Sequence, residues 1–382
     1  MIKPFITPLL LFATIVSHGQ VYSTLDEIEN IKPYEIHGYS KYKSLSQVTE
    51  KVHPDSIYSL LFQGQTEFPT GFGNLTNLQS VSFYQCEELD YDKIINECLK
   101  LNNLISLTFS GISRANISKN LYKLKTLKKL TLAGNTFNTI PKGLDKLPDL
   151  EILYLGDHMA GGNKILTFPK EIINLKKLRV LSLWGNMEMV LVNEFYQLHA
   201  LEELDLSFIV NLDFEKACKS FPMLKKLNIT GIENTTLTGI SNLTNLEELS
   251  MGDNFNLISL GDDFSGLKNL KKLDIQMKEQ IYSATEINKI AALPKLENLM
   301  ITILGDEDEF LFPVDGFKSL KALRIIDLTK VTISEIIDVV RNYPELESLD
   351  LSLTWTTLTP EEENKLSELS KSMTIVGFDK KK

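Results

Sequence analysis

Residues 127–135, Leu-Lys-Lys-Leu-Thr-Leu-Ala-Gly-Asn, have leucines at the first, fourth and sixth positions and an asparagine at the ninth. Similar stretches occur at residues 178–186, Leu-Arg-Val-Leu-Ser-Leu-Trp-Gly-Asn, and at residues 246–254, Leu-Glu-Glu-Leu-Ser-Met-Gly-Asp-Asn. In an extended strand, successive side chains point to opposite faces. The side chains at positions 4 and 6 therefore share one apolar face, and those at positions 3, 5 and 7 share the other.

The stretch recurs along most of the chain, with 21 to 28 residues between successive first positions. Asparagine occupies position 9 only at Asn135, Asn186 and Asn254, and Cys86 occupies it in its own unit. One such strand cannot bury its apolar face alone, so the series predicts units stacked side by side. The first positions are Ile57, Leu78, Leu104, Leu127, Leu150, Leu178, Leu201, Leu224, Leu246, Leu270, Leu296, Leu320 and Leu346.

This pattern resembles that of the leucine-rich repeat proteins, and the resemblance covers residues 57 to about 356. It implies an α/β solenoid shaped as a horseshoe, with a concave parallel β-sheet and a convex face of mixed 3₁₀- and α-helical segments. It also implies a module for protein recognition. In this family cysteine substitutes for asparagine at position 9, as Cys86 does here.

The chain divides into a signal peptide at residues 1–19, an N-terminal capping segment at 20–55, a solenoid of about 13 repeats at 56–356 and a C-terminal cap and tail at 357–382. Lys3 followed by the short apolar run Phe5–Val16 is typical of a secretory signal, with cleavage before Gln20. We therefore expect a bacterial-type exported protein, secreted or periplasmic, that is free of the membrane after cleavage.

The segments between the strands are of two kinds. Those with a proline after an apolar residue suit an extended or 3₁₀ path, whereas Ser283–Glu286 and Thr332–Glu335 match the capping box that begins an α-helix. Thr359–Glu362 predicts a closing helix in the same way. The unit of 28 residues contains an insertion at residues 158–164, which we interpret as a loop at the exit of the strand.

Composition limits the function. A net charge of −10 argues against a nucleic-acid partner, which requires a basic surface. The histidines lack metal-ligand spacing and no catalytic constellation stands out, so the sequence predicts neither an enzyme nor a metal or other cofactor. We expect a monomer. The three cysteines favour buried thiols, with a disulfide between Cys86 and Cys98 as the alternative.

The outward positions of the strands are the candidate binding surface. Position 3 carries Glu203, Lys226, Glu248 and Lys272 in four successive units, which predicts a ladder of mutually paired charges. Elsewhere the outward positions carry aromatic and apolar side chains, as binding surfaces do. The predicted binding residues are Tyr84, Ile152, Tyr154, Asp157, Val180, Trp184 and Asp205.

Two kinds of partner fit these residues. The main hypothesis is a protein bound on the concave face, with Trp184 standing clear of the sheet beside Tyr154. The alternative is a glycan, for which Tyr154 and Trp184 would be stacking platforms and Asp157 or Asp205 would accept hydrogen bonds from hydroxyl groups.

Overall fold

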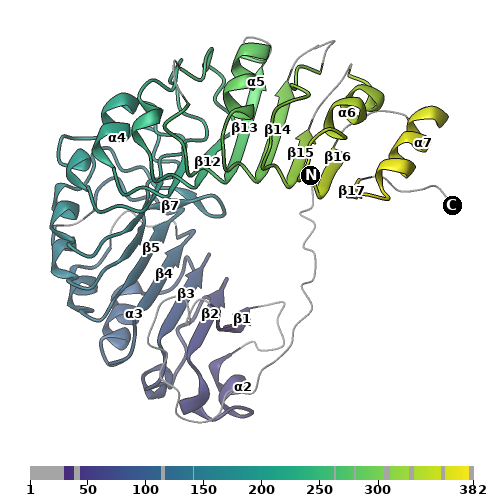
Figure 1. Ribbon diagram of the computed structural model, residues 1–382. Helices are drawn as coiled ribbons and strands as arrows, with labels where there is room; N and C mark the ends of the chain where they lie inside the picture. The colour runs from purple at the N-terminus through teal and green to yellow at the C-terminus, as the bar shows by residue number, and fades with distance from the viewer. Residues whose placement is uncertain are drawn as a thin grey trace.

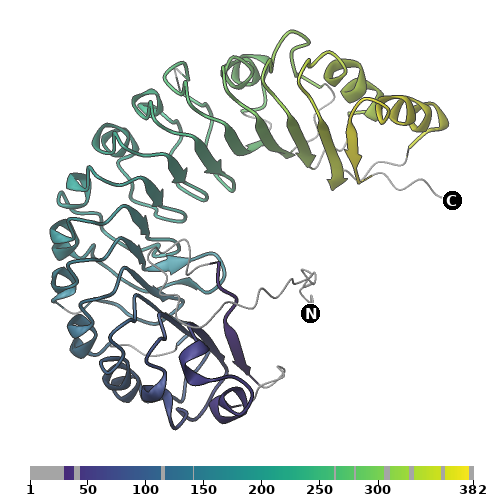
Figure 2. The same cartoon turned by 60° about the horizontal axis from the view of Figure 1, so that its bottom comes forward.

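The computed structural model describes residues 30–37, 44–112, 117–140, 142–261, 264–278, 281–304, 310–326, 331–353 and 358–377, with residues 352 and 353 described for the backbone only. The predicted signal peptide lies outside the described residues. Within them, the chain forms one arched solenoid with strands on the inner face and helical segments on the outer face (Figures 1 and 2).

A single parallel sheet of 15 strands lines the arch, and the strands follow one another in chain order. The 13 predicted units each contribute one strand, and the two capping segments add β1 and β17. The strands are β1 (Tyr34–His37), β2 (Ser59–Gln63), β3 (Ser80–Tyr84), β4 (Ser106–Ser110), β5 (Lys129–Ala133), β6 (Ile152–Tyr154), β9 (Val180–Ser182), β10 (Glu203–Asp205), β11 (Lys226–Asn228), β12 (Glu248–Met251), β13 (Lys272–Lys278), β14 (Asn298–Leu304), β15 (Ala322–Ile326), β16 (Ser348–Leu353) and β17 (Thr374–Val376).

The register of the sheet follows the repeat. Leu130 of β5 pairs with Leu153 of β6, which pairs with Leu181 of β9, and all three leucines occupy position 4. Their exposed fractions are 0%, 0% and 1%. Equal positions therefore lie side by side, so the apolar face of each unit is buried against its neighbours in one continuous core.

The outer face combines two kinds of helix, as the resemblance implies. The 3₁₀ segments are η1 (Pro54–Ser56), η2 (Phe72–Asn74), η3 (Lys119–Lys123), η4 (Leu144–Lys146), η5 (Lys170–Asn174), η6 (Phe195–Gln197) and η7 (Ile240–Asn242). The α-helices are α2 (Leu45–Thr49), α3 (Tyr91–Cys98), α4 (Phe214–Ser220), α5 (Ala284–Ala291), α6 (Ile333–Val340) and α7 (Pro360–Leu369).

The predicted capping boxes form completely at two helices, and only one of the two expected hydrogen bonds forms at a third. Thr332 and Thr359 make complete capping boxes at α6 and α7. At α5 the Ser283 side chain accepts the expected hydrogen bond from the amide of Glu286. The Glu286 carboxylate, however, accepts hydrogen bonds from the Leu260 amide and the Ser259 hydroxyl of the preceding unit. A tertiary contact thus replaces the second half of this capping box.

The side chain at position 9 joins neighbouring units. The Asn135 carboxamide accepts a hydrogen bond from the Ile112 amide at 2.9 Å and donates one to the Phe109 carbonyl at 3.2 Å. The Cys86 thiol makes an analogous contact, 3.6 Å from the carbonyl of Phe62. Water cannot reach the backbone amides and carbonyls where the chain leaves the sheet. These buried side chains therefore supply the hydrogen bonds that those groups need.

The insertion in the 28-residue unit is a β-hairpin rather than the loop that the sequence predicted. β7 (Gly156–Asp157) pairs antiparallel with β8 (Gly161–Gly162). Position 9 of this unit is filled by Asn163, not by His158. The Asn163 carboxamide accepts a hydrogen bond from the Asn135 amide at 3.0 Å and donates to the carbonyls of Leu132 and Leu155. The hairpin thus leaves the asparagine ladder intact and projects inside the arch (Figure 2).

Glycines on both sides hold the hairpin in place. A Cβ atom added at Gly134 would lie 2.2 Å from the Ala160 carbonyl oxygen, and one at Gly156 would lie 1.9 Å from that of Trp184. A Cβ atom at Gly162 would lie 2.1 Å from the Gly185 oxygen. Contacts this close exclude any side chain, so the hairpin backbone packs directly on the two flanking units.

The glycine contacts can be tested with a matched pair of variants. Gly134 and Gly64 both occupy position 8 and have φ angles of +62° and +61°, but a Cβ atom at Gly64 would meet nothing within 4 Å. Alanine should cost about 1–2 kcal/mol of backbone strain at each. Gly134→Ala should lose a further ~1–3 kcal/mol from overpacking against the hairpin, measured by denaturant unfolding. Equal losses for the two variants would show that the hairpin does not pack there.

Candidate functional site

Charges on the concave face are largely paired with one another. At position 3, Lys226 lies 3.4 Å from Glu203 and Lys272 lies 3.1 Å from Glu248, so the predicted ladder is confirmed for these two pairs. Position 2 carries a second alternating row that we did not identify from the sequence, with ion pairs Arg179–Glu151, Lys225–Glu202, Lys271–Glu247 and Lys321–Glu297. Solvent screens such pairs, so their main effect is to leave this edge of the sheet nearly neutral.

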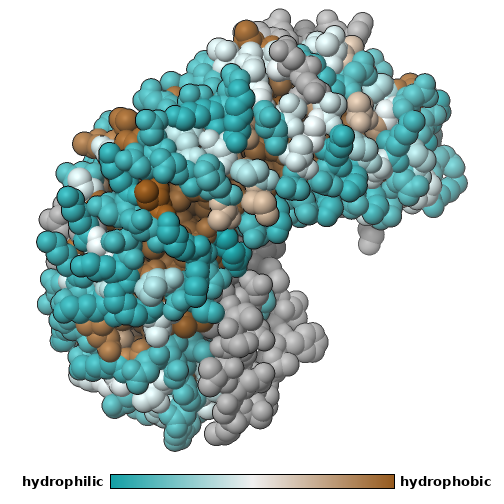
Figure 3. All heavy atoms as spheres, turned by 60° about the vertical axis from the view of Figure 1, so that its left-hand side comes forward, coloured by the Kyte–Doolittle hydropathy of each residue, from teal (hydrophilic) through white to brown (hydrophobic). Residues whose placement is uncertain are grey.

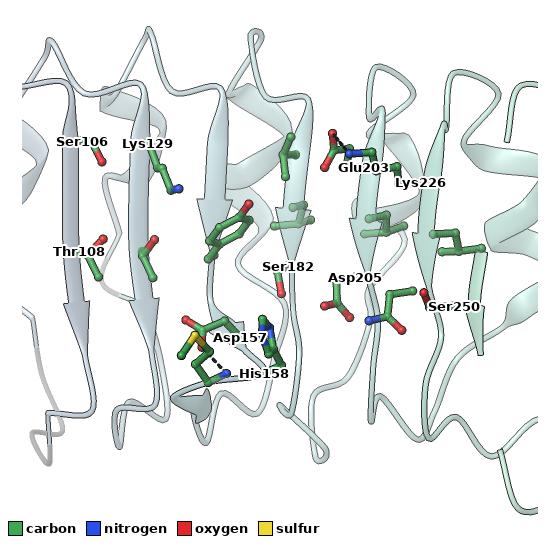
Figure 4. Close-up of a pocket in the computed structure, with 18 of the residues that line it drawn as sticks. Ser106, Thr108, Lys129, Asp157, His158, Ser182, Glu203, Asp205, Lys226 and Ser250 are labelled. Atoms are coloured by element: carbon green, nitrogen blue, oxygen red, sulfur yellow. Dashed lines mark hydrogen bonds and ion pairs between the residues drawn. The ribbon is translucent and has the colours of Figure 1, made fainter. Parts of the chain in front are cut away.

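A groove of about 510 Å³ crosses the concave face from β3 to β12. Its volume lies in the range of ligand-binding clefts. Side chains from successive strands line it in rows, and Asp157 and His158 of the hairpin project beside it (Figure 4). Small hydroxyl side chains make up much of the lining, namely Ser80, Ser82, Ser106, Thr108, Thr131, Ser182 and Ser250.

The hairpin forms one wall of the groove. The Asp157 carboxylate accepts hydrogen bonds from the amides of Met159 and Ala160, at 2.9 and 2.7 Å, which shapes the tip. Met159 at the tip is 84% exposed, the largest exposed fraction among the large hydrophobic side chains of the described residues. Across the groove, burial raises the pKa of the Tyr84 hydroxyl, and the charge of Asp157 raises it further. The hairpin therefore places a charge and an apolar tip over residues of distant strands.

Asp205, at the end of β10, also lines the groove. One of its carboxylate oxygens accepts hydrogen bonds from the amide and the hydroxyl of Ser207, at 2.9 and 2.6 Å. Burial raises the pKa of the Asp205 carboxyl above its ordinary value. The two hydrogen bonds and the charge of His158 oppose this shift, and the charge of Asp157 adds to it. The charge of Asp157 thus adds to the cost of ionising Asp205.

The next unit repeats this geometry without the charge. Asn228 occupies the same position as Asp205, and its oxygen accepts hydrogen bonds from the amide and the hydroxyl of Thr230, at 3.1 and 2.8 Å. An amide oxygen thus suffices for the turn. The negative charge of Asp205 is not required by the fold.

The structure brings together five of the seven predicted binding residues. Tyr84, Tyr154, Asp157, Val180 and Asp205 line one groove. Ile152 and Val180 are only 5% exposed, because they pack together beneath Tyr154 in a small apolar cluster. The prediction that Ile152 is a contact surface is therefore wrong. Val180 borders the groove, but its buried side chain mainly supports the tyrosine ring.

Trp184 is partly buried and is not among the residues that line the groove. Its ring packs edge-to-face on Phe208, with centroids 5.2 Å apart. A Cβ atom at Gly161 of the hairpin would lie 3.9 Å from the same ring. The expectation that Trp184 stands clear of the sheet is therefore wrong, because its ring packs on Phe208 and lies beside Gly161 of the hairpin.

His158, Met159 and the hydroxyl rows were not identified from the sequence. A signal for the hairpin was nevertheless present. The nine-residue stretches at 127–135 and 178–186 end in the motif Leu-x-Gly-Asn. In this unit the motif is interrupted, with Leu155-Gly156 on one side and Gly162-Asn163 on the other. The five residues between them, 157–161, are the insertion.

Among the described residues, no group of histidine, cysteine and acidic side chains is arranged to hold a metal ion. Cys86, Cys98 and Cys218 are buried free thiols, so the disulfide alternative is not realised. Burial raises the pKa of the Cys218 thiol to about 12, which leaves it unreactive. No helix in the described part of the chain combines the length and apolar character needed to cross a membrane.

Comparison with known proteins places the repeat in a family. A family model described as a leucine-rich repeat region matches residues 99–375. No curated protein matches the chain.

Several solved structures share the fold. A leucine-rich repeat protein of Leptospira interrogans is 23% identical, with a TM-score of 0.53, and the match covers 88% of this chain and 87% of that one. A TLR13 complex with single-stranded RNA is 19% identical, with a TM-score of 0.52, over 85% of this chain and 58% of that one. The Drosophila Toll–Spatzle complex is 16% identical, with a TM-score of 0.55, over 77% and 43%. At these identities the likeness concerns the fold.

The raised pKa of Asp205 predicts how stability depends on pH. A carboxyl group whose pKa is higher in the folded than in the unfolded protein lowers the stability of the fold when it is ionised. This loss is complete above the folded-state pKa and disappears below the unfolded-state pKa of about 3.9. Asp205→Asn should therefore be at least as stable as the wild type at pH 7.5, with the gap shrinking towards pH 4 in urea unfolding.

Asn228→Asp is the matched reverse change and should lower stability at pH 7.5. A variant Asp205→Asn that is less stable than the wild type at neutral pH would mean that the charge is stabilised in place.

Proposed function

Because the chain belongs to the leucine-rich repeat family, we propose that it is a recognition module that binds a protein partner on its concave face, in the groove beside the hairpin. The observation that carries this proposal is the hairpin. A solenoid unit folds without these five residues, as the 23-residue units show, yet here they are held rigidly inside the arch. Rigid, exposed groups beside a preformed groove favour binding because little conformational entropy is lost.

The outer face gives less support to a partner site. Its surface is mostly hydrophilic, and its hydrophobic patches are separated by polar residues (Figure 3). The groove instead combines Tyr84, Tyr154 and Met159 with charged and hydroxyl groups. Aromatic and methionine side chains at the centre of a polar surface are the composition of protein-binding sites.

The glycan alternative keeps one of its two stacking platforms. Tyr154 lines the groove together with Asp157 and Asp205, whereas Trp184 supports the hairpin and Phe208 from outside it. One aromatic ring next to hydroxyl side chains suits a sugar ring less well than the predicted pair of rings, Tyr154 and Trp184. We therefore rank a protein partner first.

Deletion of residues 157–161 tests the proposal. It restores the phrase Leu155-Gly156-Gly162-Asn163 and should leave a folded solenoid, because Asn163 still fills position 9. When the purified chain is immobilised and exposed to proteins of its own source, partners retained by the wild type should be lost with the deletion variant. Circular dichroism and a thermal melt check that this variant is folded.

Two methionines provide a control for the location of the contact. Met159 is 84% exposed at the hairpin tip, and Met223 is 50% exposed outside the groove. A photo-reactive amino acid at position 159 should cross-link to the retained partner, and one at position 223 should not. Equal cross-linking from both positions would contradict binding in the groove.

Export to a secreted or periplasmic setting is also a proposal. Its support is the charged start and short apolar run of residues 1–16 and the acidic composition. Amino-terminal sequencing of the protein from its source should show a chain that begins at Gln20. An intact Met1 on protein in the cytosolic or membrane fraction would contradict export.

A further inference from the structure

Once the ladder pairs are set aside, the charged residues that line the groove are the acids Asp157 and Asp205, the cation Lys129 and the titratable His158. Glu203 is paired with Lys226 and Glu248 with Lys272. Asp157 and Asp205 also line the groove, but neither is within ion-pair distance of a lysine or arginine in the described part of the chain. Neither carboxylate is therefore in an ion pair with a lysine or arginine among the described residues, and Lys129 instead lies over the Tyr154 ring, 5.2 Å from its centroid.

Neither charge is needed to hold the local backbone. Asn228 accepts the same two hydrogen bonds as Asp205 in the adjacent unit. Asp157 accepts two amide hydrogen bonds at the hairpin tip, and an asparagine can make the same turn. Placing two like charges near each other costs free energy, and a cationic group bound between them would offset that cost.

The surroundings of the two carboxylates suit a long basic side chain. Tyr154 of β6 lines the groove together with Asp157 and Asp205, and Met159 is 84% exposed at the hairpin tip. Lysine and arginine side chains carry an apolar stem below the charged head. An aromatic ring and a thioether can contact the stem while the carboxylates receive the head group.

The groove is also long and shallow. It runs across β3, β4, β5, β6, β9, β10, β11 and β12. With strands about 4.8 Å apart it extends roughly 30 Å, which matches about nine residues of extended peptide. The hydroxyl rows offer donors and acceptors to the peptide backbone along this path (Figure 4).

We infer that the groove binds an extended polypeptide segment and that Asp157 and Asp205 together receive one lysine or arginine side chain of that segment. This inference rests on the proposed function and adds the chemistry of the partner. The two free carboxylates favour a basic peptide over a glycan, because most glycans are neutral or acidic. The hairpin is then the specificity element, since it supplies one of the two carboxylates.

The test uses a displayed library of random twelve-residue peptides, selected on the full chain. The selected peptides should share a lysine or arginine at one aligned position. The best peptide should bind the double variant Asp157→Asn/Asp205→Asn at least about tenfold more weakly than the wild type, and methionine in place of its shared basic residue should cause a similar loss.

A second double variant controls for net charge. Glu188→Gln/Glu233→Gln also removes two exposed carboxylates, but neither lines the groove. Its affinity for the peptide should stay within about twofold of wild type, because screening weakens distant surface charges. Equal losses in the two double variants would mean general attraction of a basic peptide to an acidic protein, and would overturn the inference.

The hairpin deletion separates this inference from the proposed function. The selected peptides could lack a shared basic residue and yet fail to bind the variant without residues 157–161. That result would overturn the inference and leave the proposed function standing. Peptides that bind the deletion variant as tightly as the wild type would overturn the proposed function. If no peptide is selected, both fail for polypeptide ligands.

Discussion

The structure depends on one constraint, which is that no unit of the chain can bury its own apolar face. Position-4 and position-6 side chains are buried only because equal positions of neighbouring units lie side by side. Side-by-side stacking then removes the backbone at the end of each strand from water. The side chain at position 9 must therefore supply hydrogen bonds to the buried backbone groups. Asn135, Asn163 and Asn186 do so with the carboxamide, and Cys86 does so less strongly with its thiol.

The same constraint makes the hairpin acceptable. Residues inserted between positions 7 and 9 do not disturb the core, provided that an asparagine follows them. Asn163 meets this requirement. The added backbone fits because four neighbouring residues are glycines, namely Gly134, Gly156, Gly162 and Gly185. The Trp184 ring packs on Phe208 and lies beside Gly161 of the hairpin. A local insertion therefore becomes a packed part of the concave surface.

Electrostatics on the concave face follows from the parallel register. Because residues of equal position are neighbours, alternating charges in successive units pair across the sheet at positions 2 and 3. Asp157 of the hairpin and Asp205 lie outside these rows and are in no ion pair with a lysine or arginine of the described residues.

The sequence by itself determined the solenoid, its thirteen strands, the helical starts at Thr332 and Thr359 and the pairing of Glu203 with Lys226, because these features depend on residues at fixed spacing. It also determined that Tyr84, Tyr154 and Asp205 face the concave side, whereas Asp157 reaches the groove through the hairpin that the sequence did not predict. Only the tertiary structure decided that Ile152 and Val180 are covered, that Trp184 is packed against Phe208, and that Glu286 contacts the preceding unit. The physical reason is that position within a repeat fixes the face to which a side chain points, whereas its exposure depends on what residues far apart in the chain place above it.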